Sequence, residues 1–135
     1  MLEYIRVTAP YYIPVALAAM LVGLVTSGGS ITPMIILASL SLLTLIAGFN
    51  TFNGLTDIQI DKVNKPSRPI PSGEISERNA FLYSILLYAI SLFTAYNINL
   101  QFFYLTISAV MLTFLYSLPI VRLRRRFFIN NLTGG

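Results

Sequence analysis

Two long stretches without a formal charge constrain this chain more than any other feature. Residues 7–56 and 79–121 contain no Asp, Glu, Lys or Arg. A helix crosses the hydrocarbon core of a bilayer in about 20 residues, so each stretch is long enough for two crossings and a turn. Charged residues make up 10% of the chain, against about 25% in ordinary soluble domains. The sequence therefore predicts an all-α membrane protein.

Breaks within the two stretches place the helices. The first stretch is interrupted by Thr26-Ser27-Gly28-Gly29-Ser30 and the second by Tyr96-Asn97-Ile98-Asn99, both typical of turns. Four membrane-spanning helices are expected, roughly at 10–25, 32–52, 80–95 and 100–118, with the start of a fifth at 127–132. The second helix can continue through Asp61, Pro14 is expected to kink the first, and Ser76 is a candidate N-cap for the third.

Charge predicts the orientation of this helical bundle. All nine basic residues fall on one side of a four-span path, and the opposite turns carry none. They are Arg6, Lys62, Lys65, Arg68, Arg78, Arg122, Arg124, Arg125 and Arg126. Because basic residues concentrate on the cytoplasmic side, we expect a multi-pass protein of the cell membrane with both ends and the 53–73 segment in the cytoplasm.

Composition excludes several classes of function. The chain has no cysteine or histidine, so disulfides, thiol chemistry and the usual zinc ligands are ruled out. The net charge of +4 is explained by clustered cytoplasmic residues in contact with membrane lipid. No nucleic acid partner is expected, since the chain lacks a polar face with interleaved aromatic and basic residues.

The segment 53–73 concentrates the chemistry of the chain. Asn53, Asp57 and Asp61 follow one another at intervals of four residues, which on a helix rise about 6 Å each and share one face. Paired carboxylates suit Mg²⁺, which also takes phosphate oxygens and water. The basic residues Lys65 and Arg68 follow on a proline-rich loop, so a diphosphate carried with Mg²⁺ fits the pattern. An ordinary solvated loop between helices carries similar charges.

The whole segment resembles the first aspartate-rich motif of the UbiA superfamily of intramembrane prenyltransferases. The matching pattern is N-x-x-x-D-x-x-x-D followed by the loop K-V-N-K-P-S-R-P-I-P-S-G; Gly54 departs from it where many members carry another Asp. The resemblance implies prenyl transfer from a prenyl diphosphate to a lipophilic acceptor, with Mg²⁺ as cofactor. It implies catalytic Asp57 and Asp61, metal binding by Asn53, Asp57 and Asp61, and diphosphate binding by Lys62, Lys65 and Arg68.

The segment from Tyr116 has two interpretations. By the same resemblance, Y-S-L-P-I-V-R-L-R is a second cytoplasmic loop beside the diphosphate, in which Tyr116 and Arg122 contribute to binding. The alternative is a stop-transfer cluster of arginines that contacts anionic lipid.

The resemblance also implies parts that this sequence lacks. Members of the superfamily have about nine spanning helices and a second aspartate motif in the C-terminal half. The five acidic residues here are Glu3, Asp57, Asp61, Glu74 and Glu77, so no second pair is found. We therefore expect residues 1–135 to form a truncated N-terminal part of a UbiA-type domain, inactive alone unless a second chain supplies the C-terminal half.

Two other functions are compatible with a membrane protein rich in aspartate. One is a non-catalytic membrane protein, such as a small transporter or assembly subunit, in which Asp57 and Asp61 hold an ion. The other is a CDP-alcohol phosphotransferase, whose motif requires Asp-Gly and Ala-Arg dipeptides that are absent from this chain.

Overall fold

The computed structural model describes residues 1–26 and 28–117, over which all regular secondary structure is helical. The elements in chain order are α1 (Leu2–Val7), the 3₁₀ turn η1 (Pro10–Tyr12), α2 (Ile13–Thr26), α3 (Pro33–Thr56), α4 (Ile58–Asn64), α5 (Glu77–Tyr96) and α6 (Leu100–Ser117). The expected all-α fold is confirmed. The expected start of a fifth helix at 127–132 lies outside the described residues.

Among the described residues, three helices are long and apolar enough to cross a membrane, namely α3, α5 and α6. The segment Pro10–Thr26 is apolar but shorter, so the count of four spans stays a prediction. Pro14 does not kink this segment, because the α-helix begins only at Ile13 and leaves the proline in its first turn. A proline is tolerated there, since the N–H groups of the first turn have no intrahelical partner.

Side chains at the helix ends explain where the helices begin. The Ser76 hydroxyl accepts a hydrogen bond from the Asn79 backbone N–H at 3.2 Å and caps α5, as predicted. The Asn99 side-chain oxygen accepts from the Phe102 N–H at 2.7 Å at the start of α6. Pro33 occupies the first turn of α3. A polar side chain thus satisfies a first-turn N–H group in α5 and in α6.

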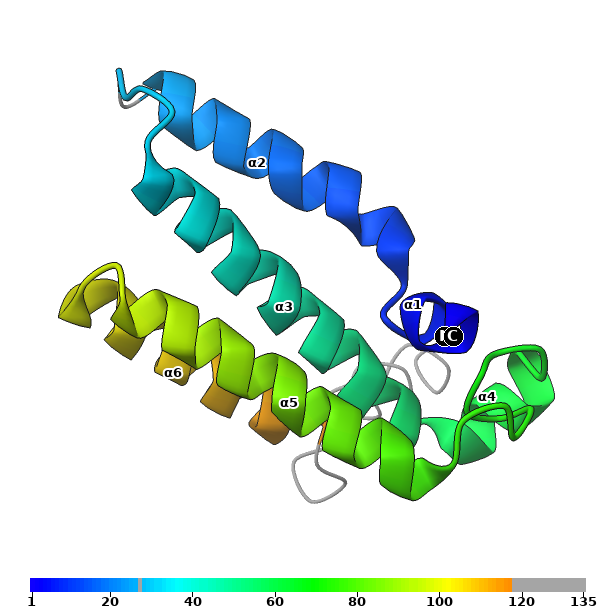
Figure 1. Ribbon diagram of the computed structural model, residues 1–135. Coiled ribbons are helices and arrows are strands. Elements are labelled where there is room, and N and C mark those ends of the chain that lie inside the picture. Colours follow the sequence, from blue (N-terminus) through cyan, green and yellow to red (C-terminus); the bar gives the residue numbers. More distant parts are fainter. Residues whose placement is uncertain (27, 118–135) are drawn as a thin grey trace, which may run out of the picture.

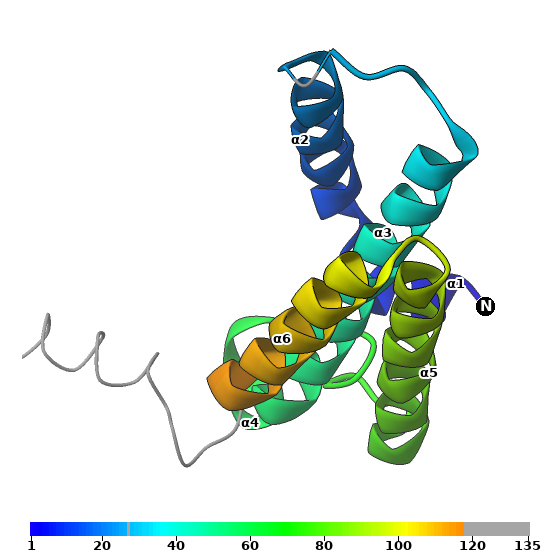
Figure 2. The same ribbon diagram turned by 90° about the vertical axis from the view of Figure 1, so that its left-hand side faces the viewer.

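The centre of the fold is the pair α3 and α5, onto which α6 packs (Figure 1). Small residues allow α3 and α5 to approach closely, as is usual between helices in lipid. A Cβ atom added at Gly48 would lie 3.2 Å from the ring of Tyr88. Helix α2 diverges from α3 toward their connection, so it packs less closely than the other long helices (Figure 2).

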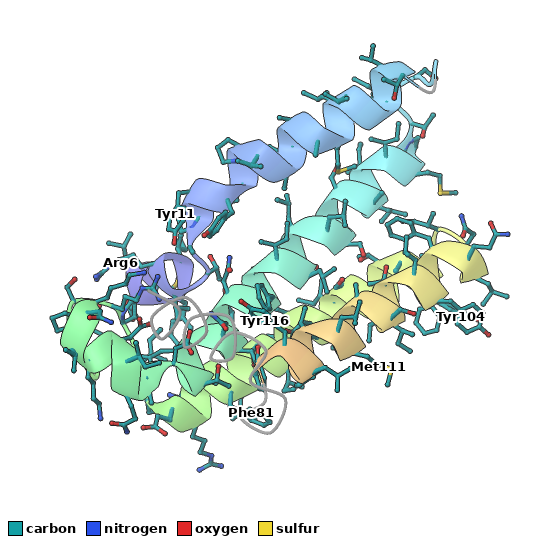
Figure 3. The ribbon with its side chains drawn as sticks, turned by 180° about the vertical axis from the view of Figure 1, so that it is seen from behind. Arg6, Tyr11, Phe81, Tyr104, Met111 and Tyr116 are labelled. Atoms are coloured by element: carbon teal, nitrogen blue, oxygen red, sulfur yellow. The ribbon has the colours of Figure 1, made fainter. Side chains whose placement is uncertain are left out.

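The outer faces of the bundle carry large apolar side chains. Val22 on α2 is 63% exposed, and Leu105 and Met111 on α6 are 67% and 63% exposed. Met111 and Tyr104 point away from the other helices (Figure 3). Exposing so much apolar surface to water is unfavourable, so we expect these faces to contact lipid tails.

The charged segments gather at one end of the bundle. Helices α1 and α4 and the loop 65–76 lie together at the end opposite the α2–α3 and α5–α6 turns (Figure 1). A small apolar cluster holds them to α5: Val7 from α1, Ile70 and Ile75 from the loop, and Ala80 from α5 are all buried. The fold thus brings the N-terminal helix and the proline-rich loop to the same end.

Candidate metal and diphosphate site

A hollow with a volume of about 440 Å³ opens at the charged end of the bundle. Its walls come from α1, η1, α3, α4 and the loop after α4. The lining residues are Arg6, Val7, Ala9, Pro10, Tyr11, Tyr12, Asn50, Asn53, Gly54, Asp57, Asp61, Lys65, Ser67, Arg68, Pro69, Ile70 and Pro71. Five of the eight predicted site residues are therefore brought together in one cavity.

The aspartate stripe crosses a break between two helices. Helix α3 ends at Thr56, and Asp57 has backbone angles (φ −95°, ψ 7°) outside the helical range. The helical spacing of the three side chains is kept across this break. The Asp57 N–H donates to the Asn53 carbonyl at 3.0 Å, and the Asp61 N–H donates to the Asp57 carbonyl at 2.8 Å. The three side chains thus line the same hollow, and the Asn53 amide donates to Asp57 Oδ2 at 3.3 Å.

Arg68 reaches from the loop to the stripe. Its Nη1 donates to Asp61 Oδ2 at 2.7 Å in an ion pair. The Asp61 side chain is only 8% exposed and that of Arg68 is 37% exposed. Such a pair is partly shielded from solvent, so the attraction between the charges is stronger than on an open surface. A fixed guanidinium therefore stands against one of the two carboxylates.

Lys62 and Tyr116 are not among the residues that line the hollow, although both were predicted site residues. Lys62 lies on α4 and is exposed. The ring of Tyr116 on α6 packs against Phe49, with 6.0 Å between the ring centroids. Arg122 lies outside the described residues. The predicted roles of these three residues remain predictions, as do the roles of the five residues that line the hollow.

The N-terminal segment also contributes to the hollow, which was not predicted from the sequence. Arg6, Tyr11 and Tyr12 form one wall, and Arg6 and Tyr11 lie at the same end of the bundle as α4 (Figure 3). Asn50 on α3 was missed as well, although an amide within an apolar stretch is a signal that could have marked it. For Arg6, the only signal was an isolated cation before a long uncharged stretch.

The donor groups in the hollow suit a hard cation. Asp57, Asp61 and Asn53 offer carboxylate and amide oxygens, which are the ligands that Mg²⁺ prefers. Within the part of the chain that the structure describes, no group of three or more His, Cys, Asp or Glu could hold a metal ion. A magnesium ion here would take its remaining ligands from water and phosphate oxygens, which is its usual mode of binding.

Comparison with known families identifies the fold. The sequence profile described as the UbiA prenyltransferase family matches residues 12–135. The chain belongs to this family. The match includes the stripe Asn53, Asp57 and Asp61 and the loop that follows it, so the resemblance of the 53–73 motif is confirmed by the rest of the chain.

Several relatives carry the same name. The chain is 46% identical over 70 residues to a digeranylgeranylglyceryl phosphate synthase of Pyrococcus furiosus, covering 52% of this chain and 25% of the relative. It is 33% identical over 129 residues to a digeranylgeranylglyceryl phosphate synthase of Methanosphaera stadtmanae, covering 96% of this chain and 46% of the relative. The chain thus spans less than half the length of these UbiA relatives.

Solved structures of UbiA proteins have the same fold. A UbiA homologue from Archaeoglobus fulgidus bound to GPP and Mg²⁺ superimposes with a TM-score of 0.78 at 31% identity, over 88% of this chain and 44% of that one. A structure described as a digeranylgeranylglyceryl phosphate synthase in membranes gives a TM-score of 0.80 at 27% identity, over 85% of this chain and 42% of that one. Together with the three apolar helices, these matches make the chain an integral, multi-pass membrane protein.

Proposed function

We propose that the hollow binds the diphosphate of a prenyl diphosphate together with Mg²⁺, and that the chain takes part in prenyl transfer to a lipophilic acceptor. The observation that carries the proposal is the convergence of Asp57, Asp61, Lys65 and Arg68 on one cavity in a UbiA fold. A solved neighbour of the same fold is bound to GPP and Mg²⁺. An ion site alone would not require the two cations beside the carboxylates.

We assign the residues that line the hollow to two roles, metal binding and phosphate binding. Asp57 and Asp61, with Asn53 beside them, supply oxygen ligands for a metal ion. Lys65 and Arg68 supply positive charge to the phosphate oxygens, and the planar guanidinium of Arg68 is suited to grip two oxygens at once. We assign Lys62, Tyr116 and Arg122 to the same diphosphate on the strength of the motif.

The reaction that follows from this arrangement breaks the bond between the allylic carbon and the diphosphate oxygen. Negative charge then develops on the leaving diphosphate, and groups already placed around it lower the barrier because they match that charge in the transition state. Bound Mg²⁺ would supply further neutralisation of the leaving group. Lys65 and Arg68 hold the departing diphosphate, while the acceptor oxygen or carbon attacks the allylic carbon and loses a proton.

The shared name of the relatives suggests the first acceptor to test. Digeranylgeranylglyceryl phosphate contains two prenyl groups on a glyceryl phosphate, so a singly prenylated glyceryl phosphate is the acceptor we propose. Geranylgeranyl diphosphate is the matching donor.

We also propose that the charged end of the bundle faces the cytoplasm. All nine basic residues lie in the segments that flank the predicted spans on one side, and the positive-inside rule orients such a protein. The hollow would then draw a soluble diphosphate head group from the cytoplasm while its prenyl tail stays in the bilayer.

Calorimetry on the chain purified in detergent tests the binding step. We expect geranyl diphosphate to bind in the presence of Mg²⁺ and to lose most of its affinity when EDTA is added. Asp57→Ala should abolish the metal dependence, while Glu77→Gln on α5, outside the lining, should keep it. Equal affinity with Mg²⁺ and with EDTA would contradict the proposal. Transfer of a labelled geranylgeranyl group to the acceptor, measured with a chain that supplies the C-terminal half also present, would then test the chemistry.

A further inference from the structure

The N-terminal helix α1 is too short to cross a membrane. It packs against the loop that carries Arg68 as well as against the long helices. Val7 is buried against Ile70 and Ile75 of the loop and Ala80 of α5. Tyr4 packs edge-on against Tyr83, with ring centroids 5.1 Å apart. A helix of six residues has little stability of its own, so these contacts are what fix it.

Arg6 connects α1 to both arms of the loop that carries Arg68. Its Nη1 donates to Glu74 Oε2 at 2.9 Å, and its Nη2 donates to the Ser67 backbone carbonyl at 2.9 Å. Ser67 directly precedes Arg68, and Glu74 lies on the returning arm of the loop. One side chain thus bridges the outgoing and returning arms from a helix more than sixty residues away in the sequence.

The loop between these two contacts is folded on itself. The Ser72 N–H donates to the Arg68 carbonyl at 3.0 Å, the Gly73 N–H to Ile70 at 3.1 Å, and the Ile75 N–H to Pro69 at 3.0 Å. Gly73 has a φ of +83°, a conformation that is easy only for glycine. These hydrogen bonds join the residues between the two contacts into one compact turn, so holding both arms sets the position of Arg68.

The N-terminal segment is itself tied to α3, which carries the aspartate stripe. The Asn50 amide donates to the Thr8 carbonyl at 2.9 Å. Ala9, the next residue, has a φ of +53°, which costs energy for any residue with a Cβ and persists only where the surroundings impose it. Arg6 is therefore held in place relative to Asn53 and Asp57.

We propose that Arg6 is a positioning residue for the diphosphate site: it clamps the loop so that Arg68 and Lys65 stay opposite Asp57 and Asp61. The inference rests on the proposed function and adds a role for α1. The guanidinium of Arg6 already has both of its Nη groups engaged by the protein. Its contribution to binding then passes through the loop and not through a phosphate oxygen.

A double-mutant cycle separates this role from direct binding of the diphosphate by Arg6. If Arg6 acts through the loop, Arg6→Ala and Glu74→Ala each weaken Mg²⁺-dependent geranyl diphosphate binding by about three- to tenfold, and the double variant is no worse than Arg6→Ala alone. If Arg6 contacts phosphate directly, Glu74→Ala removes a competing anion and tightens binding. Arg6→Lys should recover part of the affinity, because an ammonium can reach one of the two partners.

Hydrogen exchange of the ligand-free chain in detergent supplies a readout that does not depend on the proposed function. We expect Arg6→Ala and Glu74→Ala to speed exchange of the Ser72, Gly73 and Ile75 amides by about three- to tenfold, and Glu77→Gln to leave it unchanged. Unchanged exchange in Arg6→Ala, or tighter diphosphate binding in Glu74→Ala, would overturn the inference. If the unmodified chain bound no diphosphate while Arg6→Ala still loosened the loop, the proposed function would fail and the clamp would remain.

Discussion

Arg68 and Asp61 form an ion pair of 2.7 Å inside the hollow, between the loop and the first turn of α4. The pair places a cation on one of the oxygen atoms that a magnesium ion would use. Magnesium arriving alone must therefore share or displace Arg68. Magnesium arriving with a diphosphate offers Arg68 new anionic partners, so the exchange costs less in that case.

The first prediction follows from this competition. Arg68→Ala should strengthen the binding of Mg²⁺ alone by about tenfold, because a competing charge-assisted hydrogen bond is removed. The same variant should weaken Mg²⁺-dependent binding of geranyl diphosphate, since the phosphates lose a cation. Both affinities can be measured by calorimetry. Arg68→Lys keeps the charge but not the fork of donors, so its values should fall between those of Arg68→Ala and the unmodified chain. Changes of the same sign in both affinities would refute the competition.

The second prediction ranks the three residues of the stripe. Asp57→Ala and Asp61→Ala should each lower Mg²⁺-dependent diphosphate binding by at least about tenfold, because each removes a charge from the metal site. Asn53→Ala should cost less, since a neutral amide is a weaker ligand. Membrane insertion should be unaffected, which the yield from the membrane fraction checks. A larger loss in Asn53→Ala than in either aspartate variant would contradict the assignment.

Much of the fold was predictable because apolar stretches and turn residues are local signals. The breaks at 26–30 and 96–99, the cap at Ser76 and the long helices from residues 33 and 77 follow from them. Helix α1 was missed, because six residues around Glu3 and Arg6 carry no periodic pattern and their order depends on packing against the loop. The break at Asp57 was missed as well, since the spacing of Asn53, Asp57 and Asp61 fits an unbroken helix equally well.

The site was predictable only where it lies within one segment. Asn53 to Arg68 are close in the sequence, and their spacing brings them into one hollow. Arg6 and Asn50 reach the same hollow through tertiary contacts, namely the bridge to Ser67 and Glu74 and the hydrogen bond to Thr8. These contacts depend on where α1 packs in the folded protein. The hydrophobic periodicity of a sequence does not predict that position.

The third prediction concerns topology, and the absence of cysteine makes it simple to test. Ser30→Cys, in the α2–α3 connection, should resist an impermeant thiol reagent added from the cytoplasmic side of membrane vesicles. Ser72→Cys, in the loop at the charged end, should react. The reason is that the basic residues cluster on the side of Ser72. Equal labelling of the two cysteine variants from the cytoplasmic side would contradict the proposed orientation. Labelling both variants after detergent solubilisation controls for differences in the reactivity of the two thiols.

The last prediction concerns the contact that joins the two central helices. Ser41 on α3 donates through Oγ to the Ser91 carbonyl at 2.9 Å, and Ser91 on α5 donates back to the Ser41 carbonyl at 2.8 Å. Both serines are fully buried, so neither hydroxyl can turn to water. Hydrogen bonds between helices in a membrane contribute about 0.6 kcal/mol on average and up to about 1.7 kcal/mol.

We therefore expect Ser41→Ala to lower the free energy of unfolding by about 0.6–1.7 kcal/mol in reversible denaturation by SDS in mixed micelles. Ser41→Val should cost more, because its larger side chain must also fit where α3 and α5 approach closely. Ser108→Ala is the matched control: the Ser108 hydroxyl donates to the Tyr104 carbonyl on the exposed face of α6, within one helix, and its loss should change little. If Ser41→Ala and Ser108→Ala had equal effects, the Ser41 hydroxyl would contribute nothing to the association of α3 and α5, and the remaining bond from Ser91 and close packing around Gly48 would have to account for it.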